Sequence, residues 1–411
     1  MKGWSHESIN TFRYNRRRSY DCCKCTEKYI TSQNKDAVVE ISDTLEYISP
    51  FLNKAVTGGY VYMARNTPKF YGSVYKTTDE NTVINKTMGL TTTSFRNKLL
   101  PLVQDFNPDI VITTHPFAAE IITSLKTHGV VDIPVINIVT DFAVHQAYIS
   151  DGVDAYIVSS REMVDDMVKR GVERVKVYPY GIPVKSEFLD PIDREKVFAD
   201  EGLDPDIPTI LIMAGSFGVT DILKIYHKIV KSKEDFQVIV ITGKNEKLYE
   251  TFERYLRKIA LNNTLIEIKE LTRAAKSSSS VRKSKKKKAA KPTKLMYFTD
   301  EVAKYMHMAD LIVTKPGGLT VSEAIASNLP MGIFKAIPGQ EEQNADFLVG
   351  KNMAVRLEKN NTCTAVITDL IRNREKLDEM KESIRLFSKG NSAANIYLIM
   401  LELLEKYQNK E

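Results

Sequence analysis

The sequence predicts an α/β protein with two domains, each built around a parallel β-sheet. The chain has 411 residues, of which 43% are hydrophobic and 27% charged, an ordinary composition for a globular protein of two domains. Near-continuous apolar runs alternate with helical patterns along both halves, and strands of this kind are typical of a parallel sheet covered by helices on both faces. Two Rossmann-like halves of this kind would face each other across a cleft.

The alternation is most regular in the second half, where five segments have the apolar, β-branched composition of buried strands: TILIMAG, QVIVITG, DLIVTK, PMGIFK and MAVRL. TLIEIKE and LMYF flank a basic insert. The strands expected in the first half are VVEIS, PDIVITTHP, PVINIVTD and AYIVSS. We therefore expect an N-terminal domain over residues 36–185, a C-terminal domain over 186–390 and a final helix over 391–411, with a linker near 182–190.

The net charge of +6 comes from one segment, residues 272–294, which holds ten Lys or Arg and no acidic residue. The rest of the chain is therefore acidic, at about −4. Serines and a lysine block without an apolar period indicate a disordered insert. It is either a solvated loop or a tether to an anionic membrane surface. Nucleic acid is not an expected partner, because no aromatic residues lie among the lysines.

The cysteines and the hydropathy pattern favour a cytoplasmic protein. Cys22, Cys23 and Cys25 are clustered and Cys363 is isolated, which is no disulfide framework. The cluster lacks the matched second pair of a zinc site. We expect neither a secretory signal nor a membrane-spanning helix, because the sequence shows no suitable apolar run.

Two glycine loops of the second half have the features of an anion site. The loop AGSFG at residues 214–218 and the string KPGGLTVSEAIASNLP from Lys315 each lie between a strand and a helix. Such loops direct backbone N–H groups and the positive end of a helix at a diphosphate. Glu323, about one and a half turns into the helix, can accept two ribose hydroxyls. The sequence contains neither a P-loop nor a dinucleotide fingerprint.

These strings, followed by PGQEEQN, resemble glycosyltransferase family 28, and specifically its monogalactosyldiacylglycerol synthase and diacylglycerol glucosyltransferase branch. ITGKN, YFTDEVAKYMHMADLIVTKPGG, DTLEYISPFLNK, TPKFYGSVYK and VTDFAVHQAYISDGVDAYIVSS match in the family's order, from about Val38 to the C-terminus. The resemblance implies a GT-B fold and inverting transfer of glucose or galactose from a UDP-sugar to diacylglycerol. It implies no cofactor and no catalytic metal.

The resemblance also implies the roles of individual residues. The diphosphate would lie on Gly215, Ser216, Gly317, Gly318 and Leu319. The uracil would lie against Phe298 and Thr299, and the ribose would bind Glu323. The sugar would contact Gln340, Glu342, Gln343 and Asn344. From its own sequence pattern, the N-terminal domain offers Asp141, at the end of the strand INIVTD, and His145 as candidates for the general base, each with a structural alternative, while His115 is expected to line the cleft.

Residues 45–76 carry seven Phe or Tyr among lysines and an arginine, a composition suited to a membrane interface. The alternative is an ordinary helix face that packs on the core. With the lipid acceptor, this composition predicts a protein held peripherally on the inner face of the cell membrane.

Residues 1–35 depart from the family pattern, which begins with a β-strand and a G-G-G-H loop. We therefore expect the first strand of the N-terminal sheet to be missing. A set of synonymous codons for residues 6–27, read in another frame from an ATG spanning residues 6 and 7, encodes MKVLILSATTGGGHTIAANAL. We hypothesise that the first ~25 residues are a frameshifted reading of the true N-terminus, which leaves the activity of the literal chain in doubt.

Three rival functions remain open. One is transfer of N-acetylglucosamine to a cell-wall lipid precursor by a related branch of the family. Another is a catalytically inactive UDP-sugar-binding protein, which the absent G-G-G-H loop favours. The third is an epimerase, which would act on a UDP-sugar without any lipid.

Overall fold

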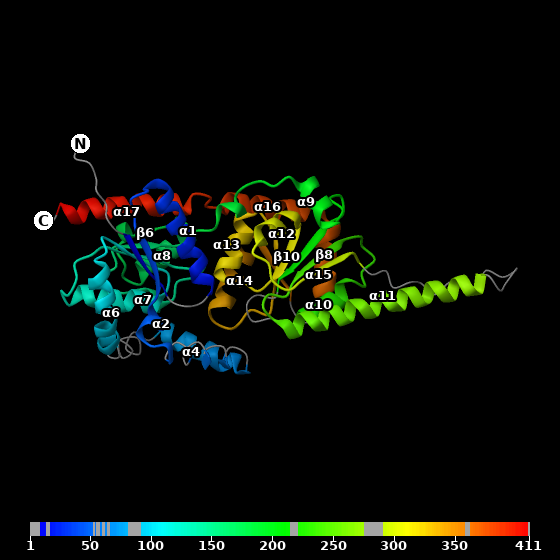
Figure 1. The fold of residues 1–411 in the computed structure, drawn as a ribbon, viewed down its shortest axis with the longest axis horizontal. Helices are drawn as coiled ribbons and strands as arrows, with labels where there is room; N and C mark the ends of the chain where they lie inside the picture. Colours follow the sequence, from blue (N-terminus) through cyan, green and yellow to red (C-terminus); the bar gives the residue numbers. More distant parts are fainter. Residues whose placement is uncertain are drawn as a thin grey trace.

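The computed structural model describes residues 9–13, 17–51, 54, 58–59, 62–63, 66–80, 92–213, 221–274, 291–357 and 362–409. They form two α/β domains side by side, each around a six-stranded parallel sheet (Figure 1). The N-terminal sheet has the order β2-β1-β3-β4-β5-β6, with strands Ile9–Arg13, Val39–Asp43, Val111–Thr113, Val135–Ile138, Ala155–Ile157 and Val177–Tyr178 for β1 to β6. The C-terminal sheet has the order β12-β11-β10-β7-β8-β9, with strands Thr209–Met213, Gln237–Ile241, Thr293–Met296, Leu311–Thr314, Met331–Phe334 and Ala354–Leu357 for β7 to β12.

The two-domain α/β prediction is confirmed, and the reason is visible in the burial of the strands. Every residue of β8 and β10 is buried, as expected for strands covered on both faces. The helices that flank the N-terminal sheet are α1 Arg17–Gln33, α2 Thr44–Ile48, α4 Pro68–Glu80, α6 Thr92–Phe106, α7 Pro116–Thr127 and α8 Arg161–Lys169. Those of the C-terminal domain are α9 Arg194–Glu201, α10 Asp221–Ile229, α11 Glu246–Ala274, α12 Val302–Met308, α13 Gly318–Ala326, α14 Gln340–Gly350, α15 Thr362–Arg372 and α16 Arg374–Phe387.

The expectation of a missing first strand is wrong. β1 lies in the interior of the N-terminal sheet, where Thr11 aligns with Ile41 of β2 and with Ile112 of β3. Strand pairing uses backbone N–H and C=O groups, so any five residues in an extended conformation can fill this position. The sequence INTFR also includes β-branched and aromatic residues, which suit a strand.

The cysteine cluster lies on α1, directly after this strand. Cys22, Cys23 and Cys25 are all buried, and burial raises the pKa of Cys25 to about 12. Cys23 Sγ lies 3.5 Å from Thr114 Oγ1 at the end of β3. Burial also raises the pKa of Cys22, so the thiols of Cys22 and Cys25 stay protonated and pack as small apolar groups.

The final helix returns to the N-terminal domain, as Figure 1 shows for α17 Ser392–Gln408. The ring of Tyr397 packs edge-on against Tyr29 of α1, with centroids 5.9 Å apart. Lys126 donates a hydrogen bond of 2.6 Å to the hydroxyl of Tyr407, which itself donates to Asp154 at 2.8 Å. The C-terminal segment therefore stabilises the pairing of the two domains.

The basic segment is folded at both ends. Helix α11 continues through TLIEIKE to Ala274 and extends away from the body of the domain in Figure 1. At the other end, Lys291 lies over the ring of Phe236 and Lys294 forms an ion pair of 2.6 Å with Glu201. Residues 275–290 lie outside the described part of the chain. Among the described residues, no helix is long and apolar enough to cross a membrane.

Candidate functional site

The strand order of the C-terminal sheet places a ligand site between β7 and β10. From β7 the chain continues to β8 and β9 on one side and then crosses to β10 on the other, so the strand order reverses between β7 and β10. Ligands of open α/β sheets bind at such a switch point, beyond the carboxyl ends of the strands. The loop after β7 contains Gly215 and Ser216, both of which lie outside the described residues. The loop after β10 leads into α13 and is described in full.

Gly317 and Gly318 form the N-terminus of α13, as the sequence predicted for a diphosphate site. Gly317 is the N-cap residue and has an extended backbone, with φ −76° and ψ 134°. A Cβ atom at Gly318 would lie 1.9 Å from the carbonyl oxygen of Thr140, so only glycine fits there. Leu319 is buried at 5% exposure and its side chain belongs to the core. A loop of the N-terminal domain therefore lies directly against the helix N-terminus.

Asp141, the residue after Thr140, connects the two domains. Its carboxylate accepts hydrogen bonds from the side-chain amides of Gln340 and Asn344, the latter at 3.2 Å. The hydroxyl of Tyr148 donates a third bond of 2.9 Å. The side chain of Asp141 is only 3% exposed. Asp141 thus lies at the predicted ligand edge, where it contacts two of the residues expected at the sugar.

The side chain of Asn344 forms hydrogen bonds within the protein in this structure. It is fully buried, and its amide nitrogen also donates to the carbonyl oxygen of Pro316 at 3.0 Å. Its amide oxygen accepts a bond of 2.8 Å from the backbone N–H of Phe142. Asn344 therefore ties the loop after β10 to the N-terminal domain.

A buried ion pair that we did not predict supports the same loops. Lys315 Nζ lies 3.6 Å from Glu341 Oε2, and each side chain is 7% exposed. The same carboxylate oxygen accepts a bond of 3.0 Å from the backbone N–H of Ile337. The pair joins the loop after β10 to the start of α14. In the sequence the lysine stands directly before Pro-Gly-Gly and the glutamate inside PGQEEQN, but neither motif indicates that the two residues pair.

The other two residues expected at the sugar have different environments. Glu342 forms an ion pair of 2.8 Å with Arg356. Gln343 accepts a bond of 2.9 Å from the hydroxyl of Tyr75, which belongs to α4 of the N-terminal domain. Gln343 is therefore in contact with the aromatic segment that we assigned to the acceptor.

The predicted uracil and ribose residues lie around the same sheet edge. Phe298 follows β9, is 44% exposed and has Lys244 Nζ at 4.8 Å from its ring centroid. Thr299 Oγ1 accepts a bond of 3.0 Å from the backbone N–H of Glu301, which fixes the turn before α12. Glu323 is half-buried on α13, one residue after Ser322, whose hydroxyl donates to Gly318 O at 2.8 Å. The structure thus places an exposed ring and a half-buried carboxylate at this edge of the sheet.

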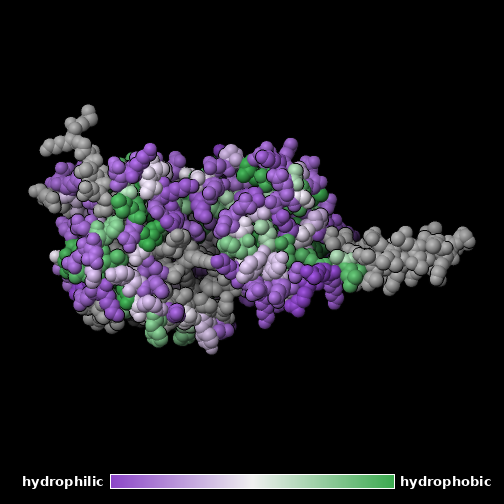
Figure 2. Space-filling model, in the orientation of Figure 1, coloured by the Kyte–Doolittle hydropathy of each residue, from purple (hydrophilic) through white to green (hydrophobic). Residues whose placement is uncertain are grey.

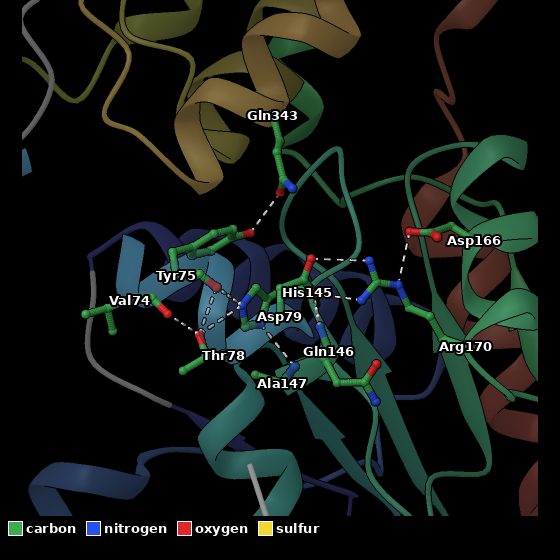
Figure 3. A network of polar contacts seen from close by, with 10 residues as sticks. All are labelled: Val74, Tyr75, Thr78, Asp79, His145, Gln146, Ala147, Asp166, Arg170 and Gln343. Atoms are coloured by element: carbon green, nitrogen blue, oxygen red, sulfur yellow. Dashed lines mark hydrogen bonds and ion pairs between the residues drawn. The ribbon is translucent and has the colours of Figure 1, made fainter. Parts of the chain in front are cut away.

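His145 joins the aromatic helix α4 to the loop after β4 (Figure 3). Its Nδ1 accepts a bond of 3.1 Å from the backbone N–H of Ala147. In the neutral ring the proton is then on Nε2, which donates to the carbonyl oxygen of Tyr75 at 3.1 Å. Burial lowers the pKa of His145, so the neutral form is favoured. In this geometry both ring nitrogens are engaged with α4 and its neighbouring loop.

Asp79 and Arg170 complete this network, and we did not predict either. Arg170 donates to Asp79 Oδ1 at 2.7 Å, and the backbone N–H of Gln146 donates to the same oxygen at 2.8 Å. Burial alone would raise the pKa of Asp79, but these bonds outweigh it and the pKa is lowered. Asp79 and Arg170 are 91 positions apart in the sequence and share no motif, so no sequence pattern indicates the pair.

His115 caps α7 at the end of β3, where its Nδ1 accepts a bond of 3.2 Å from the backbone N–H of Phe117. This is the switch point of the N-terminal sheet, since β1 and β3 are neighbours there. Within the described residues, no group of three or more His, Cys, Asp or Glu is arranged to hold a metal ion.

The comparisons with known proteins cover both domains. Residues 21–184 match the family described as monogalactosyldiacylglycerol (MGDG) synthase, and residues 209–396 match the glycosyltransferase family 28 C-terminal domain. The chain is 27% identical to a processive diacylglycerol beta-glucosyltransferase of Bacillus licheniformis, over 91% of this chain and 89% of the relative. It is 30% identical to the protein of that name from Bacillus thuringiensis, over 75% and 71% of the two chains.

Solved structures of lower identity share the fold. MurG of Acinetobacter baumannii is 14% identical with a TM-score of 0.58, over 97% of this chain and 99% of that one. The UDP-GlcNAc 2-epimerase of Neisseria meningitidis, solved with UDP-GlcNAc, is 12% identical with a TM-score of 0.59, over 96% and 100%. At these identities the likeness concerns the architecture, which is the GT-B arrangement of two facing α/β domains.

Proposed function

Because the chain belongs to the family of the processive diacylglycerol beta-glucosyltransferases, we propose that it transfers glucose or galactose from a UDP-sugar to the free hydroxyl of diacylglycerol. The observation that carries this proposal is the pairing of a family-28 donor domain with an MGDG-synthase acceptor domain along one chain. The N-terminus of α13, with Gly317 and Gly318, faces the domain boundary where donor and acceptor would meet.

The donor would bind along the carboxyl edge of the C-terminal sheet. The diphosphate would lie on the free N–H groups of α13, which stabilise negative charge without a cation. The uracil would stack near Phe298, and Glu323 would accept the ribose hydroxyls. As UDP departs, negative charge develops on its diphosphate beside the same helix N-terminus. The N–H groups there therefore stabilise the transition state more than the bound substrate.

Transfer from an α-linked UDP-sugar to a β-glycoside inverts the anomeric carbon, so one displacement and one general base suffice. We assign the base to Asp141, because its carboxylate lies beside Gly318 and contacts the Gln340 side chain. The donor sugar would replace the amide contacts that Asp141 makes here. His145 would hold α4 and its loop in place, since both of its ring nitrogens are engaged.

The membrane side of the proposal rests on the segment around α2 and α4. Phe51, Tyr62 and Phe70 are 82%, 64% and 60% exposed, and Lys69 and Lys76 lie on α4. In Figure 2 a few hydrophobic residues are visible at the lower edge of the molecule. Exposed aromatic residues beside cations favour the interface of an anionic bilayer. We propose peripheral attachment to the inner face of the cell membrane through this surface.

The test is an assay with labelled UDP-glucose and UDP-galactose, with and without diacylglycerol vesicles, followed by separation of the lipid products. A glycolipid formed only in the presence of diacylglycerol supports the proposal. Conversion of one UDP-sugar into another without lipid would indicate an epimerase. UDP binding without any product would indicate an inactive binding protein, and a glycolipid formed only from UDP-N-acetylglucosamine and a cell-wall lipid precursor would indicate the related branch.

The basic segment is tested separately by deletion of residues 275–290, which leaves Lys291 and Lys294 in the folded domain. Seven Lys or Arg are removed, so binding to vesicles containing anionic lipid should weaken at low salt. Equal binding of the deleted and intact proteins would show that the basic segment does not attach the protein to anionic membranes. Neutral vesicles are the control.

A further inference from the structure

Helix α4 of the acceptor domain packs directly on the loop that begins α14 of the donor domain. A Cβ atom at Gly72 would lie 2.6 Å from Pro338 Cβ, so the helix backbone approaches this loop closely. On the other side of the contact, a Cβ at Gly339 would lie 2.8 Å from the ring of Tyr75. Gly339 also has φ +98°, a conformation that favours glycine. One glycine on each domain therefore permits the contact.

Tyr75 is the polar link within this contact. Its hydroxyl donates to Gln343 Oε1 at 2.9 Å, across 268 positions of sequence. Its ring lies against His145, with centroids 4.3 Å apart, and its carbonyl oxygen accepts from His145 Nε2 (Figure 3). Ring, hydroxyl and backbone of Tyr75 are therefore fixed by groups from both domains.

We propose that Tyr75 is a positioning residue that orients Gln343 toward the donor sugar. Helix α4 must therefore pack against the loop that begins α14 before Gln343 can bind the sugar. The hydroxyl of Tyr75 donates its hydrogen bond to the amide oxygen of Gln343. Among the described residues, the amide nitrogen of Gln343 makes no bond to protein, so its N–H groups remain for a hexose hydroxyl. Without Tyr75 the Gln343 side chain would rotate freely and lose part of its affinity for the sugar.

This inference rests on the proposed function, because it takes Gln343 as a contact of the donor sugar. It goes further in naming an acceptor-domain residue that acts only through Gln343. The predicted signature is specific to the sugar, because the contacts of Tyr75 described above are with Gly339, Gln343 and His145 and not with the glycines assigned to the diphosphate. UDP itself should bind equally well with or without the Tyr75 hydroxyl.

The experiment compares Tyr75→Phe with Tyr397→Phe by calorimetry with UDP and with UDP-glucose or UDP-galactose, and by steady-state kinetics. Tyr397→Phe removes a phenol hydroxyl from the remote contact between α1 and α17 and serves as the matched control. We expect Tyr75→Phe to weaken UDP-hexose binding and raise its KM about three- to tenfold, the loss of one hydrogen bond, with UDP affinity unchanged. Tyr397→Phe should change neither ligand.

A double-mutant cycle with Gln343→Ala tests whether Tyr75 acts through Gln343. The double variant should bind UDP-hexose no worse than Gln343→Ala alone. Gly72→Ala, which pushes α4 away from Pro338, should give the same sugar-specific loss. Additive effects, equal loss of UDP and UDP-hexose, or wild-type behaviour of Tyr75→Phe would each overturn the inference. A protein that binds UDP-hexose with this signature but forms no glycolipid would leave the inference standing and refute the proposed activity.

Discussion

The donor and acceptor sides of the site are built in different ways. On the donor side, Gly317, Gly318 and Glu323 lie on one loop and its helix, so a single stretch of sequence carries these three residues of the proposed donor site. On the acceptor side, the contacts join residues that are far apart: Asp79 with Arg170, Asp141 with Asn344, and Tyr75 with Gln343. Changes to the polar groups of the donor loop and helix should therefore alter the affinity for UDP, whereas changes to the contacts between the domains should alter turnover or the binding of the sugar.

The largest expected effect concerns the N-terminal segment that contains β1 and the start of α1. The alternative reading places its apolar run VLIL at codons 8–12 and its G-G-G-H at codons 16–20, which coincide with β1 and the start of α1. An in-frame glycine loop there would add backbone donors at the N-terminal switch point. We expect the protein from its native source to yield a tryptic peptide containing VLILSATTGGGH. Recovery of the peptide SYDCCK instead would show that the printed N-terminus is the real one.

Asp141→Asn should lower kcat by about 10²- to 10⁴-fold if Asp141 takes the proton of the acceptor hydroxyl. The amide keeps the size of the side chain, so binding of UDP should change little. The measurement is the rate of glycolipid formation at saturating donor, with calorimetry of UDP in parallel. Retention of wild-type turnover would remove Asp141 as the base, and Asp165→Asn, on the exposed face of α8, provides the matched control.

Gly318→Ala should lower kcat/KM by about 10²-fold. Its methyl group would overlap the carbonyl oxygen of Thr140 and would push the two domains apart by roughly an ångström. A displacement of that size lowers the rate strongly where the reacting groups must be precisely oriented. Gly350→Ala is the control, because a Cβ there meets nothing within 4 Å. Equal activities of the two variants would mean that the close contact with Thr140 is not needed for turnover.

Glu323→Ala should weaken UDP binding by about 10- to 100-fold, because hydrogen bonds to a charged group contribute about 1.5–3 kcal/mol. The turnover of bound donor should change less, in keeping with a donor-side role. Calorimetry with UDP and with 2′,3′-dideoxy-UDP checks the assignment. The dideoxy ligand should bind the wild-type and variant proteins alike, and unchanged UDP affinity of the variant would remove the ribose assignment.

The smallest expected effect is a pH dependence of stability caused by His145. Burial lowers its pKa below the ordinary value of 6.5, so the unfolded chain takes up a proton first as the pH falls. The contribution of the neutral ring is complete above pH 6.5 and is lost progressively below it. His145→Gln should therefore reduce the slope of unfolding free energy against pH between about 6.5 and 5. Denaturant unfolding of both proteins at several pH values measures this slope, and an unchanged slope in the variant would show that His145 does not cause the pH dependence. Exposed His128, replaced by Gln, is the control.

Much of the donor half could be predicted from the sequence because its signals are local. Apolar strand, Pro-Gly-Gly and amphipathic helix follow one another directly, and each has a backbone consequence that does not depend on the rest of the fold. Lys315 and Glu341 were not predicted as a pair because they belong to two separate motifs, and local patterns do not indicate contacts between motifs. Nothing in their spacing indicates that two parallel strand ends bring them within 3.6 Å.

By itself, the sequence determined the two α/β domains, the positions of most strands along the chain and the glycine turn at the start of α13, because hydrophobic periodicity and glycine placement act over a few residues. Only the tertiary structure decided that INTFR fills the sheet interior, since backbone pairing accepts almost any extended segment. It also decided which residues of the N-terminal domain contact the donor loop. Those contacts depend on how two domains meet, and the sequence of either domain alone does not specify that geometry.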